Sequence, residues 1–328
     1  MKKIIALVFS DLHLNIWRKF NSNNERTLQQ FRVLHSMYDL HNIHNVPIIH
    51  CGDLFHKPEG IDSELLHLFD ISTDQYMRDY NRTCESWLYS ISGNHDMNTI
   101  SKVGIKPWSL VEYVSNHYNF ISCIDYKSLY LGNKVWLHGI PYIDNNTGLS
   151  EYIKNNLEIV DGCKNILVLH TDYPGAKDTD GRVIGSVDNL NQNAFKDLDL
   201  VLCGHIHKPQ QLGKKVFMIG APNQQRRTDK CSKLGYWELY SDLTMKFIEL
   251  KGFPKFIDVE SEADIKDDGN YYTVISKKAS ETKIVKHKIT KQLSKKTLAS
   301  RYMRAKGIRD KEKKGLLVNI LNKSDGLC

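Results

Sequence analysis

Short apolar runs alternate along this chain with longer segments in which apolar residues recur every three or four positions. In the first third, the short runs predict strands over residues 3–9, 47–49 and 87–91. The longer periodic segments predict helices over residues 25–44 and 63–80. The resulting β-α-β-α-β order predicts a parallel sheet flanked by helices.

The second half of the chain has a different pattern. Four apolar runs predict further strands over residues 135–137, 166–169, 200–202 and 216–219. Residues 235–239 and 245–249 then form a predicted antiparallel pair around Ser241 and Asp242. Two sheets packed face to face with helices outside would accommodate these elements. Between His170 and Leu190 lies a Gly- and Asp-rich loop that could close over a site.

The periodic pattern breaks after residue 252. We expect a main domain over residues 1–252, a small capping or linker segment over 253–290, and a basic helical tail over 291–328. Residues 261–270 are acidic and polar, which is typical of a linker or a long loop, and residues 271–289 have enough alternation for a small strand element.

Composition argues against a membrane-spanning protein and against a disulfide-stabilised one. The 328 residues include no apolar stretch near the ~20 residues that a membrane span needs, and the apolar N-terminal run is better interpreted as a first strand than as a signal peptide. Seven cysteines, an odd number without a CxxC pair, argue against a disulfide framework and favour a reducing cytoplasm.

Charge is unevenly distributed along the chain. Between Ser276 and Lys314, fifteen Lys and Arg residues outnumber three acidic ones, so the rest of the chain is mildly acidic although the total is +7. This asymmetry predicts a polyanionic or acidic partner for the tail. A merely solvated tail is the alternative.

Five polar stretches each follow an apolar run that predicts a strand. They are Asp11-Leu12-His13, Gly52-Asp53, Gly93-Asn94-His95-Asp96, His170 and Gly204-His205-Ile206-His207. Because residues i and i+2 of an extended chain point to the same side, the paired residues are expected to converge on one ion or two. Carboxylate, imidazole and amide ligands without thiolate suit a first-row divalent metal. Two ions 3.5–4 Å apart are a standard arrangement for hydrolysing phosphate esters.

These five stretches resemble the signature of the calcineurin-like metallophosphoesterase superfamily over roughly residues 1–250. The resemblance implies an α/β fold, a four-layer α/β/β/α sandwich, here with a small C-terminal appendage. It also implies two divalent ions, with Mn²⁺ favoured and Mg²⁺, Fe²⁺ or Zn²⁺ as alternatives. The implied first ion is held by Asp11, His13, Asp53 and His207; Asp53 bridges to the second, which Asn94, His170 and His205 complete.

A narrower resemblance involves Gly52-Asp53-Leu54-Phe55-His56-Lys57-Pro58, which is similar to a segment of the SbcD-type DNA repair nucleases. The compact length is closer to the nuclease subunits of large phages. We therefore expect a metal-dependent DNA exo/endonuclease, the catalytic subunit of an ATPase–nuclease complex in recombination and repair. The alternatives are a phosphomonoesterase, a cyclic-nucleotide phosphodiesterase or a protein phosphatase with the same site, and a non-catalytic DNA-tethering scaffold.

Three further residues receive catalytic roles in this interpretation. His95 is the candidate partner of the leaving 3′ oxygen, and Asp96 is expected to fix its tautomer and raise its basicity. His56, three residues after the bridging carboxylate, is expected to contact the substrate or to be an ordinary loop residue.

The expected partners are DNA, a second copy of the chain and an SbcC-like coiled-coil ATPase. The C-terminal helical tail would bind the ATPase through apolar anchors at Leu298, Tyr302, Leu316, Leu317 and Ile320. Alternatively, its basic residues contact DNA phosphates directly. The expected location is the cytoplasm, that of the host if the chain is phage-encoded, and no membrane is involved.

Overall fold

The computed structural model describes residues 2–20, 25–57, 62–79, 86–97, 102–106, 108–146, 148–184, 190–231 and 233–275. The chain divides into two compact units, Met1–Ile257 and Asp258–Cys328. The predicted tail over residues 291–328 lies outside the described residues. Within the described part, no helix has the length and hydrophobicity needed to cross a membrane.

The first of two six-stranded sheets carries the N-terminal half of the pattern. Its order is β14 (Met245–Glu249), β13 (Gly235–Tyr240), β1 (Ile4–Phe9), β2 (Ile48–His50), β3 (Leu88–Ser90) and β4 (Ile121–Cys123). Strands β1 to β4 run parallel, whereas β13 pairs antiparallel with both β1 and β14. The predicted parallel core and the predicted antiparallel pair are therefore confirmed, and they lie in one sheet.

The second sheet carries the later strands. Its order is β11 (Gln210–Leu212), β12 (Val216–Met218), β10 (Leu200–Gly204), β7 (Lys164–His170), β6 (Val135–Gly139) and β5 (Lys127–Gly132). Strands β12, β10, β7 and β6 are parallel, and the two edge strands are antiparallel to their neighbours. The four predicted runs form these four central strands.

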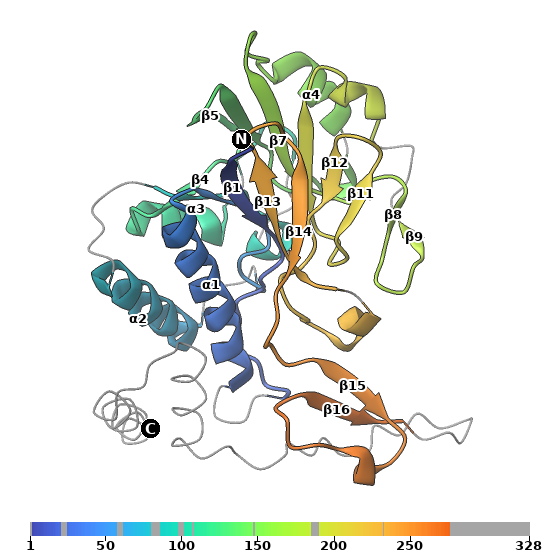
Figure 1. Ribbon diagram of the computed structural model, residues 1–328. Helices are drawn as coiled ribbons and strands as arrows, with labels where there is room; N and C mark the ends of the chain where they lie inside the picture. The colour runs from blue at the N-terminus through green and yellow to red at the C-terminus, as the bar shows by residue number, and fades with distance from the viewer. Residues whose placement is uncertain are drawn as a thin grey trace. The chain divides into compact units, whose positions relative to one another are not determined.

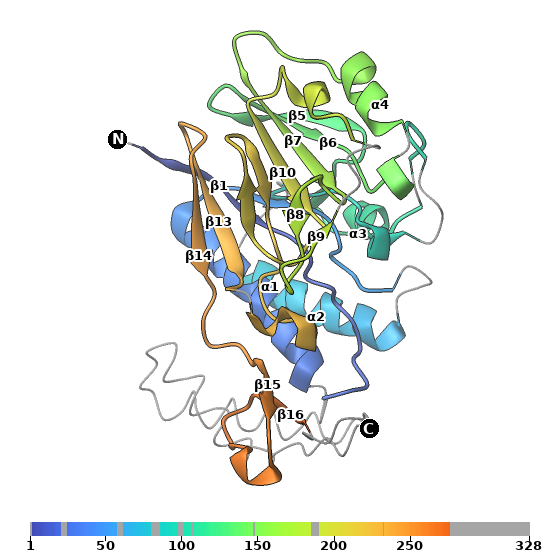
Figure 2. The ribbon, with the colours of Figure 1, turned by 90° about the vertical axis from the view of Figure 1, so that its right-hand side faces the viewer.

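The helices cover the outer faces of both sheets. The helices α1 (Glu25–His44), α2 (Ser63–Asp79) and α3 (Leu110–His117) pack on the first sheet, and α4 (Leu149–Asn156) packs on the second. Figures 1 and 2 show α1 and α2 on one side of the paired sheets and α4 on the other. Helix α1 has the predicted bounds, and α2 ends at the last described residue before residue 80.

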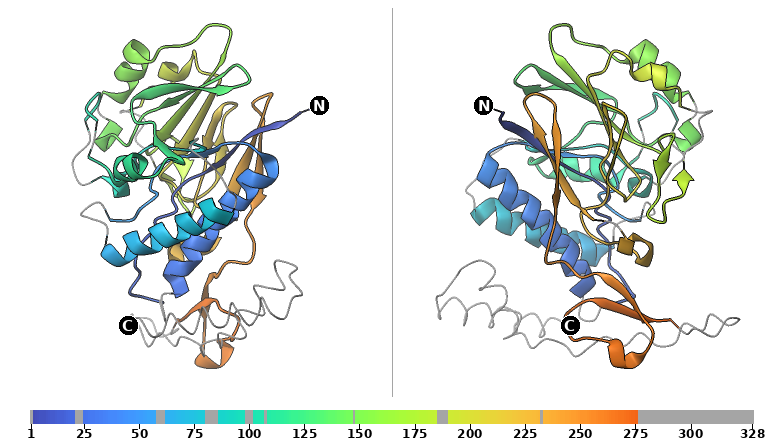
Figure 3. Two further views of the ribbon diagram at one scale, coloured as in Figure 1. Left: turned by 90° about the vertical axis from the view of Figure 1, so that its left-hand side faces the viewer. Right: turned by 45° about the vertical axis from the view of Figure 1, so that its right-hand side comes forward.

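Three separate apolar clusters lie between the four layers. Along β7, Ile166 and Val168 belong to the cluster between the sheets, whereas Leu167 and Leu169 belong to the cluster under α4. The alternation follows from the two-residue period of a strand, and it explains why residues 166–169 of β7 are all apolar: both faces of the strand are buried. The predicted α/β/β/α sandwich is confirmed (Figure 3).

Because the strands that precede the candidate ligands pair in parallel, their carboxyl ends lie at the same edge of each sheet. In the first sheet Phe9 is in register with His50, and His50 with Ser90. In the second sheet His170 is in register with Gly204. The loops after β1, β2, β3, β7 and β10 therefore leave the two sheets at equivalent positions, where ligands bind in open parallel sheets.

Several short elements complete the description. The Gly- and Asp-rich loop after β7 contains a two-stranded hairpin of β8 (Ala176–Lys177) and β9 (Val183–Ile184). Short 3₁₀ turns occur at η2 (Asn94–Asp96), η3 (Asp144–Asn146), η4 (Gln192–Phe195), η5 (Arg227–Cys231) and η6 (Glu262–Asp264). Strands β15 (Phe256–Val259) and β16 (Tyr271–Val274) form a separate two-stranded sheet. Strand β16 confirms the strand expected at the start of the 271–289 segment. The rest of that segment, from residue 276, lies outside the described residues.

Candidate metal centre

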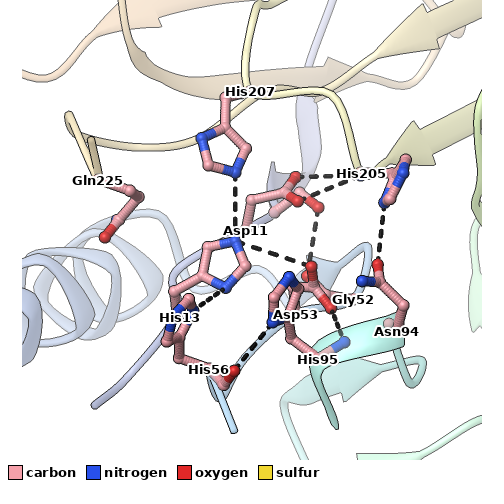
Figure 4. A network of polar contacts seen from close by, with 12 residues as sticks. Asp11, His13, Gly52, Asp53, His56, Asn94, His95, His205, His207 and Gln225 are labelled. Carbon is pink, nitrogen blue, oxygen red and sulfur yellow. Dashed lines mark hydrogen bonds and ion pairs between the residues drawn. The ribbon is translucent and has the colours of Figure 1, made fainter. Parts of the chain in front are cut away.

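The seven predicted metal ligands come together at the carboxyl ends of the parallel strands. Six of them form two groups, in each of which the ligand atoms lie within 4.8 Å of one another. The first group is Asp11, His13 and His207, and the second is Asp53, His170 and His205. In Figure 4 the labelled side chains of Asp11, His13, Asp53, His205 and His207 lie around a common space, on loops from both sheets.

Asp53 belongs to the second group and also faces the first. Its Oδ2 atom is 3.3 Å from Nε2 of His170 and 3.7 Å from Nε2 of His13, and its Oδ1 accepts the backbone N–H of His95 at 2.8 Å. Burial alone would raise the pKa of this carboxyl group, but the adjacent histidine rings outweigh it and hold the pKa well below its usual range. Asp53 is therefore a buried carboxylate that faces histidines of both groups.

Asn94 joins the second group through its side-chain oxygen. Its Oδ1 lies 2.9 Å from Nδ1 of His205 and 3.1 Å from Nε2 of His170. The Nδ1–H of His170 donates to the carbonyl of Cys51 at 2.8 Å, so Nε2 is the nitrogen that faces the group. Burial lowers the pKa of His170, but the charge of Asp53 prevails and raises it to about 9.

In the first group two ring nitrogens face each other directly. Nε2 of His13 lies 3.2 Å from Nε2 of His207, with Asp11 beside them. Burial, followed by neighbouring histidines, lowers the pKa of His13 despite the charge of Asp53. Two buried imidazole nitrogens and a carboxylate converge here, and such a donor set accommodates a divalent cation better than protons. With carboxylate, amide and imidazole donors converging in the second group as well, the residues fit a pair of divalent ions.

The backbone at these positions is unusual. Asp11, His13, Asp53 and His205 all have positive φ angles, of 53°, 52°, 58° and 83°. Non-glycine residues rarely adopt this left-handed region, and such conformations concentrate at functional sites where the surrounding structure maintains them. Four of the seven candidate ligands thus occupy strained backbone positions at strand ends.

Two glycines allow the loops to approach one another closely. A Cβ atom on Gly93 would collide with the backbone N and Oδ1 of Asp53, and one on Gly204 would collide with the Cys51 carbonyl and the His170 ring. Because both close contacts involve the loops that carry the ligands, any larger side chain would displace them.

His95 and His56 form a stacked pair beside the first group. Their ring centroids are 4.9 Å apart with an interplanar angle of 9°. The Nδ1–H of His95 donates to the carbonyl oxygen of His56 at 2.9 Å, and Nδ1 of His56 lies 3.2 Å from Nδ1 of His13. Burial and the neighbouring His95 lower the pKa of His56 to about 4. His56 is therefore part of the site and not an isolated loop residue.

The role expected for Asp96 is wrong. In the described part of the chain its carboxylate makes no hydrogen bond to the His95 ring; it accepts the backbone N–H groups of Asp53, Leu54, Phe55 and Gly93 at 2.8–3.2 Å. Within the η2 turn the side chain points back under the Gly52–His56 loop. The backbone carbonyl of His56, and not Asp96, fixes the tautomer of His95. Burial and the charge of Asp53 raise the pKa of Asp96 to about 8.

The sequence interpretation missed residues that support the ligands from behind. Asp229 accepts the Nδ1–H of His207 at 3.1 Å, and Asp172 lies 3.3 Å from Nε2 of His205. Gln30 of α1 donates to the carbonyls of Leu12 and His13. Asp172 is two residues after His170, a spacing that could have identified it, whereas no sequence signal marks Asp229 or Gln30.

Comparison with known proteins agrees with this geometry. The model of the calcineurin-like phosphoesterase family matches residues 6–209, a range that contains all seven candidate ligands. No curated protein shows significant similarity to the chain. One crystal structure aligns with 76% of this chain and 100% of its own, at 11% sequence identity and a TM-score of 0.44.

Proposed function

This chain belongs to the calcineurin-like phosphoesterase family, and from that premise we propose that it is a two-metal phosphodiesterase acting on DNA. The observation that carries the proposal is that Asp53, a member of the second ligand group, also faces His13 of the first, with His95 and His56 beside them. A shared carboxylate with separate histidines on either side suits two ions that clamp one phosphate.

The ions, when bound, lower the pKa of a water molecule and neutralise charge on the phosphate oxygens. The protein's own residues position the proton that the leaving oxygen needs. Because Nδ1 of His95 is engaged by the His56 carbonyl, Nε2 is the atom that donates a proton to the leaving 3′ oxygen or receives one from solvent. The stacked His56 ring limits rotation of His95.

DNA as the substrate is supported by residues at the rim of the centre. The Gly52–Pro58 segment resembles that of SbcD-type nucleases, and the exposed cation Lys57 directly follows His56 of the site. Positive charge next to a phosphodiester centre favours a polyanionic chain over a small phosphomonoester.

Assays on three substrates test this proposal. Full-length protein with Mn²⁺ should degrade linear DNA and hydrolyse bis(p-nitrophenyl) phosphate, with little activity on p-nitrophenyl phosphate; chelator should abolish the first two. Hydrolysis confined to the monoester would replace the nuclease with a phosphomonoesterase. Stoichiometric Mn²⁺ binding without hydrolysis of any substrate would favour a tethering scaffold.

We extend the proposal to a coiled-coil ATPase of the SbcC type as the partner of residues 291–328. The support is the run of basic and apolar positions in the sequence, since these residues lie outside the described part of the chain. Leu316→Asp with Leu317→Asp in the full chain should abolish co-purification with such an ATPase while hydrolysis of the small diester persists. Undiminished co-purification would reject this partner interface.

A further inference from the structure

The ring of His56 contacts the indole of Trp17 as well as the ring of His95. The Trp17 and His56 rings lie 4.8 Å apart, centroid to centroid, with an interplanar angle of 37°. The His56 and His95 rings lie 4.9 Å apart at 9°. Trp17, His56 and His95 therefore form a row of three rings, contributed by the segments that follow β1, β2 and β3.

Trp17 also packs against Arg26 of helix α1. The guanidinium carbon lies 3.8 Å from the centre of the indole ring, a distance at which a cation is attracted to an aromatic face. Arg26 is buried, and its guanidinium donates to the backbone carbonyls of Lys19 and Gln225 at 3.0 and 2.6 Å. The half-buried indole thus rests on a cation that cannot move without losing hydrogen bonds to two loops.

The indole N–H fixes the orientation of Trp17. It donates to Oε1 of Gln30 at 2.7 Å. Nε2 of the same side chain, which is only 2% exposed, donates to the carbonyls of Leu12 and His13. One buried amide therefore sets the indole relative to the loop that carries the first metal ligands.

His56 transmits this order to His95. Its backbone N–H donates to the Leu14 carbonyl at 3.1 Å, and its own carbonyl accepts the Nδ1–H of His95 at 2.9 Å. Nδ1 of His56 lies 3.2 Å from Nδ1 of His13 (Figure 4). A shift of His56 would move both the ring and the acceptor that orient His95.

From these contacts we propose that Trp17 is a positioning residue for His95. Trp17 holds the His56 ring against the His95 ring, and Nε2 of His95 thereby stays directed at the leaving 3′ oxygen. The inference rests on the proposed function, in which the oxygen of water bonds to phosphorus, the P–O3′ bond breaks and the leaving oxygen takes a proton through His95.

The test compares two esters of one nucleotide that differ in the leaving group. Full-length protein with Mn²⁺ should release thymidine 5′-monophosphate from a short oligothymidylate and from thymidine 5′-(p-nitrophenyl phosphate). The 3′ oxygen of the first needs a proton as it leaves, whereas p-nitrophenolate is stable as an anion at neutral pH and needs none.

Trp17→Leu should lower kcat on the oligothymidylate about 10–100-fold, since a misplacement of ~1 Å in a catalytic group can cost about 10²-fold. On the aryl ester kcat should stay within about threefold of wild type, because that leaving group does not need the acid. Mn²⁺ stoichiometry should not change, because Trp17 is not one of the seven candidate ligands. Trp17→Met removes the same ring if Trp17→Leu does not fold.

Two further variants separate stacking from general stability. Trp17→Phe keeps a ring for His56 but loses the N–H to Gln30, and it should restore kcat on the oligothymidylate to within about fivefold of wild type. Trp108→Leu, at a side chain that is 81% exposed, should leave both kcat values unchanged. The ratio of the two kcat values reports positioning, and Tm of each variant reports stability.

Specific outcomes would overturn the inference. Equal losses on the two esters, or no loss on either, would reject it while leaving the two-ion centre intact. An equal loss in Trp17→Phe and Trp17→Leu would reject stacking and assign the effect to the hydrogen bond with Gln30. Wild-type protein that cleaves the aryl ester alone, or neither ester, would remove the proposed nuclease together with the inference.

Discussion

The Nδ1 atom of His95 lies 2.9 Å from the carbonyl oxygen of His56, and the two rings stack at 9°. Only an N–H at Nδ1 satisfies a carbonyl acceptor, so the backbone of one motif sets the tautomer of the histidine in another. The free Nε2 of His95 is consequently the atom available for proton transfer.

His95→Gln should therefore lower the rate of DNA hydrolysis by about 10²–10⁴-fold, because glutamine cannot transfer a proton. Mn²⁺ stoichiometry, measured on the same sample, should remain at the wild-type value because His95 is not one of the seven candidate ligands. His117→Gln, at an exposed position at the end of α3, is the matched control. Near-wild-type hydrolysis in His95→Gln would remove His95 from the mechanism.

Asp96→Asn should destabilise the protein. The change replaces a carboxylate oxygen by an amide donor next to the backbone N–H groups of the Gly52–His56 loop. We expect the free energy of unfolding to fall by about 2 kcal/mol or more, with a lower Tm in thermal unfolding. A variant with unchanged Tm but a lost rate would instead restore Asp96 to an acid–base role.

Gly93→Ala should disrupt the centre by steric displacement of Asp53. The φ angle of −85° at Gly93 suits alanine, so the effect would come from the collision and not from backbone strain. Mn²⁺ binding and hydrolysis should both fall at least about tenfold. Gly162→Ala, where φ is +72° and a Cβ meets open space, should cost only about 1 kcal/mol of stability with hydrolysis unchanged. Full activity in Gly93→Ala would contradict the tight approach of these loops.

Lys57→Ala should affect DNA more than small substrates. Lys57 is exposed and follows His56 in the chain, so the proposed DNA substrate predicts that it contacts a backbone phosphate. The slope of log affinity for DNA against log salt should fall by about one, while hydrolysis of bis(p-nitrophenyl) phosphate changes far less. Lys154→Ala on α4 is the exposed control. Parallel losses on both substrates would place Lys57 in the chemical step instead.

Most of the sandwich could be predicted from apolar periodicity. Strands such as β7 and β10, buried on both faces, have unbroken apolar sequences, and helix α1 has a clear three-to-four residue period. The edge strand β5 is not predicted, because none of its residues is fully buried and its sequence has no long apolar run. The two-residue strands β8 and β9 are too short for periodicity to identify them.

The candidate ligands were found because each follows an apolar run, but the residues behind them were not. Spacing along a strand shows which side chains share a face, whereas the direction of Asp96 depends on a turn that sequence adjacency does not define. Asp229 reaches His207 across 22 residues and two strands, a contact that only the folded chain creates.

The most direct measurement of the central claim is hydrolysis of bis(p-nitrophenyl) phosphate by metal-free, full-length protein as Mn²⁺ is added stepwise. If two ions share Asp53, there should be no turnover without metal, and the rate should saturate only when two ions are bound per chain. Turnover in the absence of metal, or saturation at one ion per chain, would contradict the account.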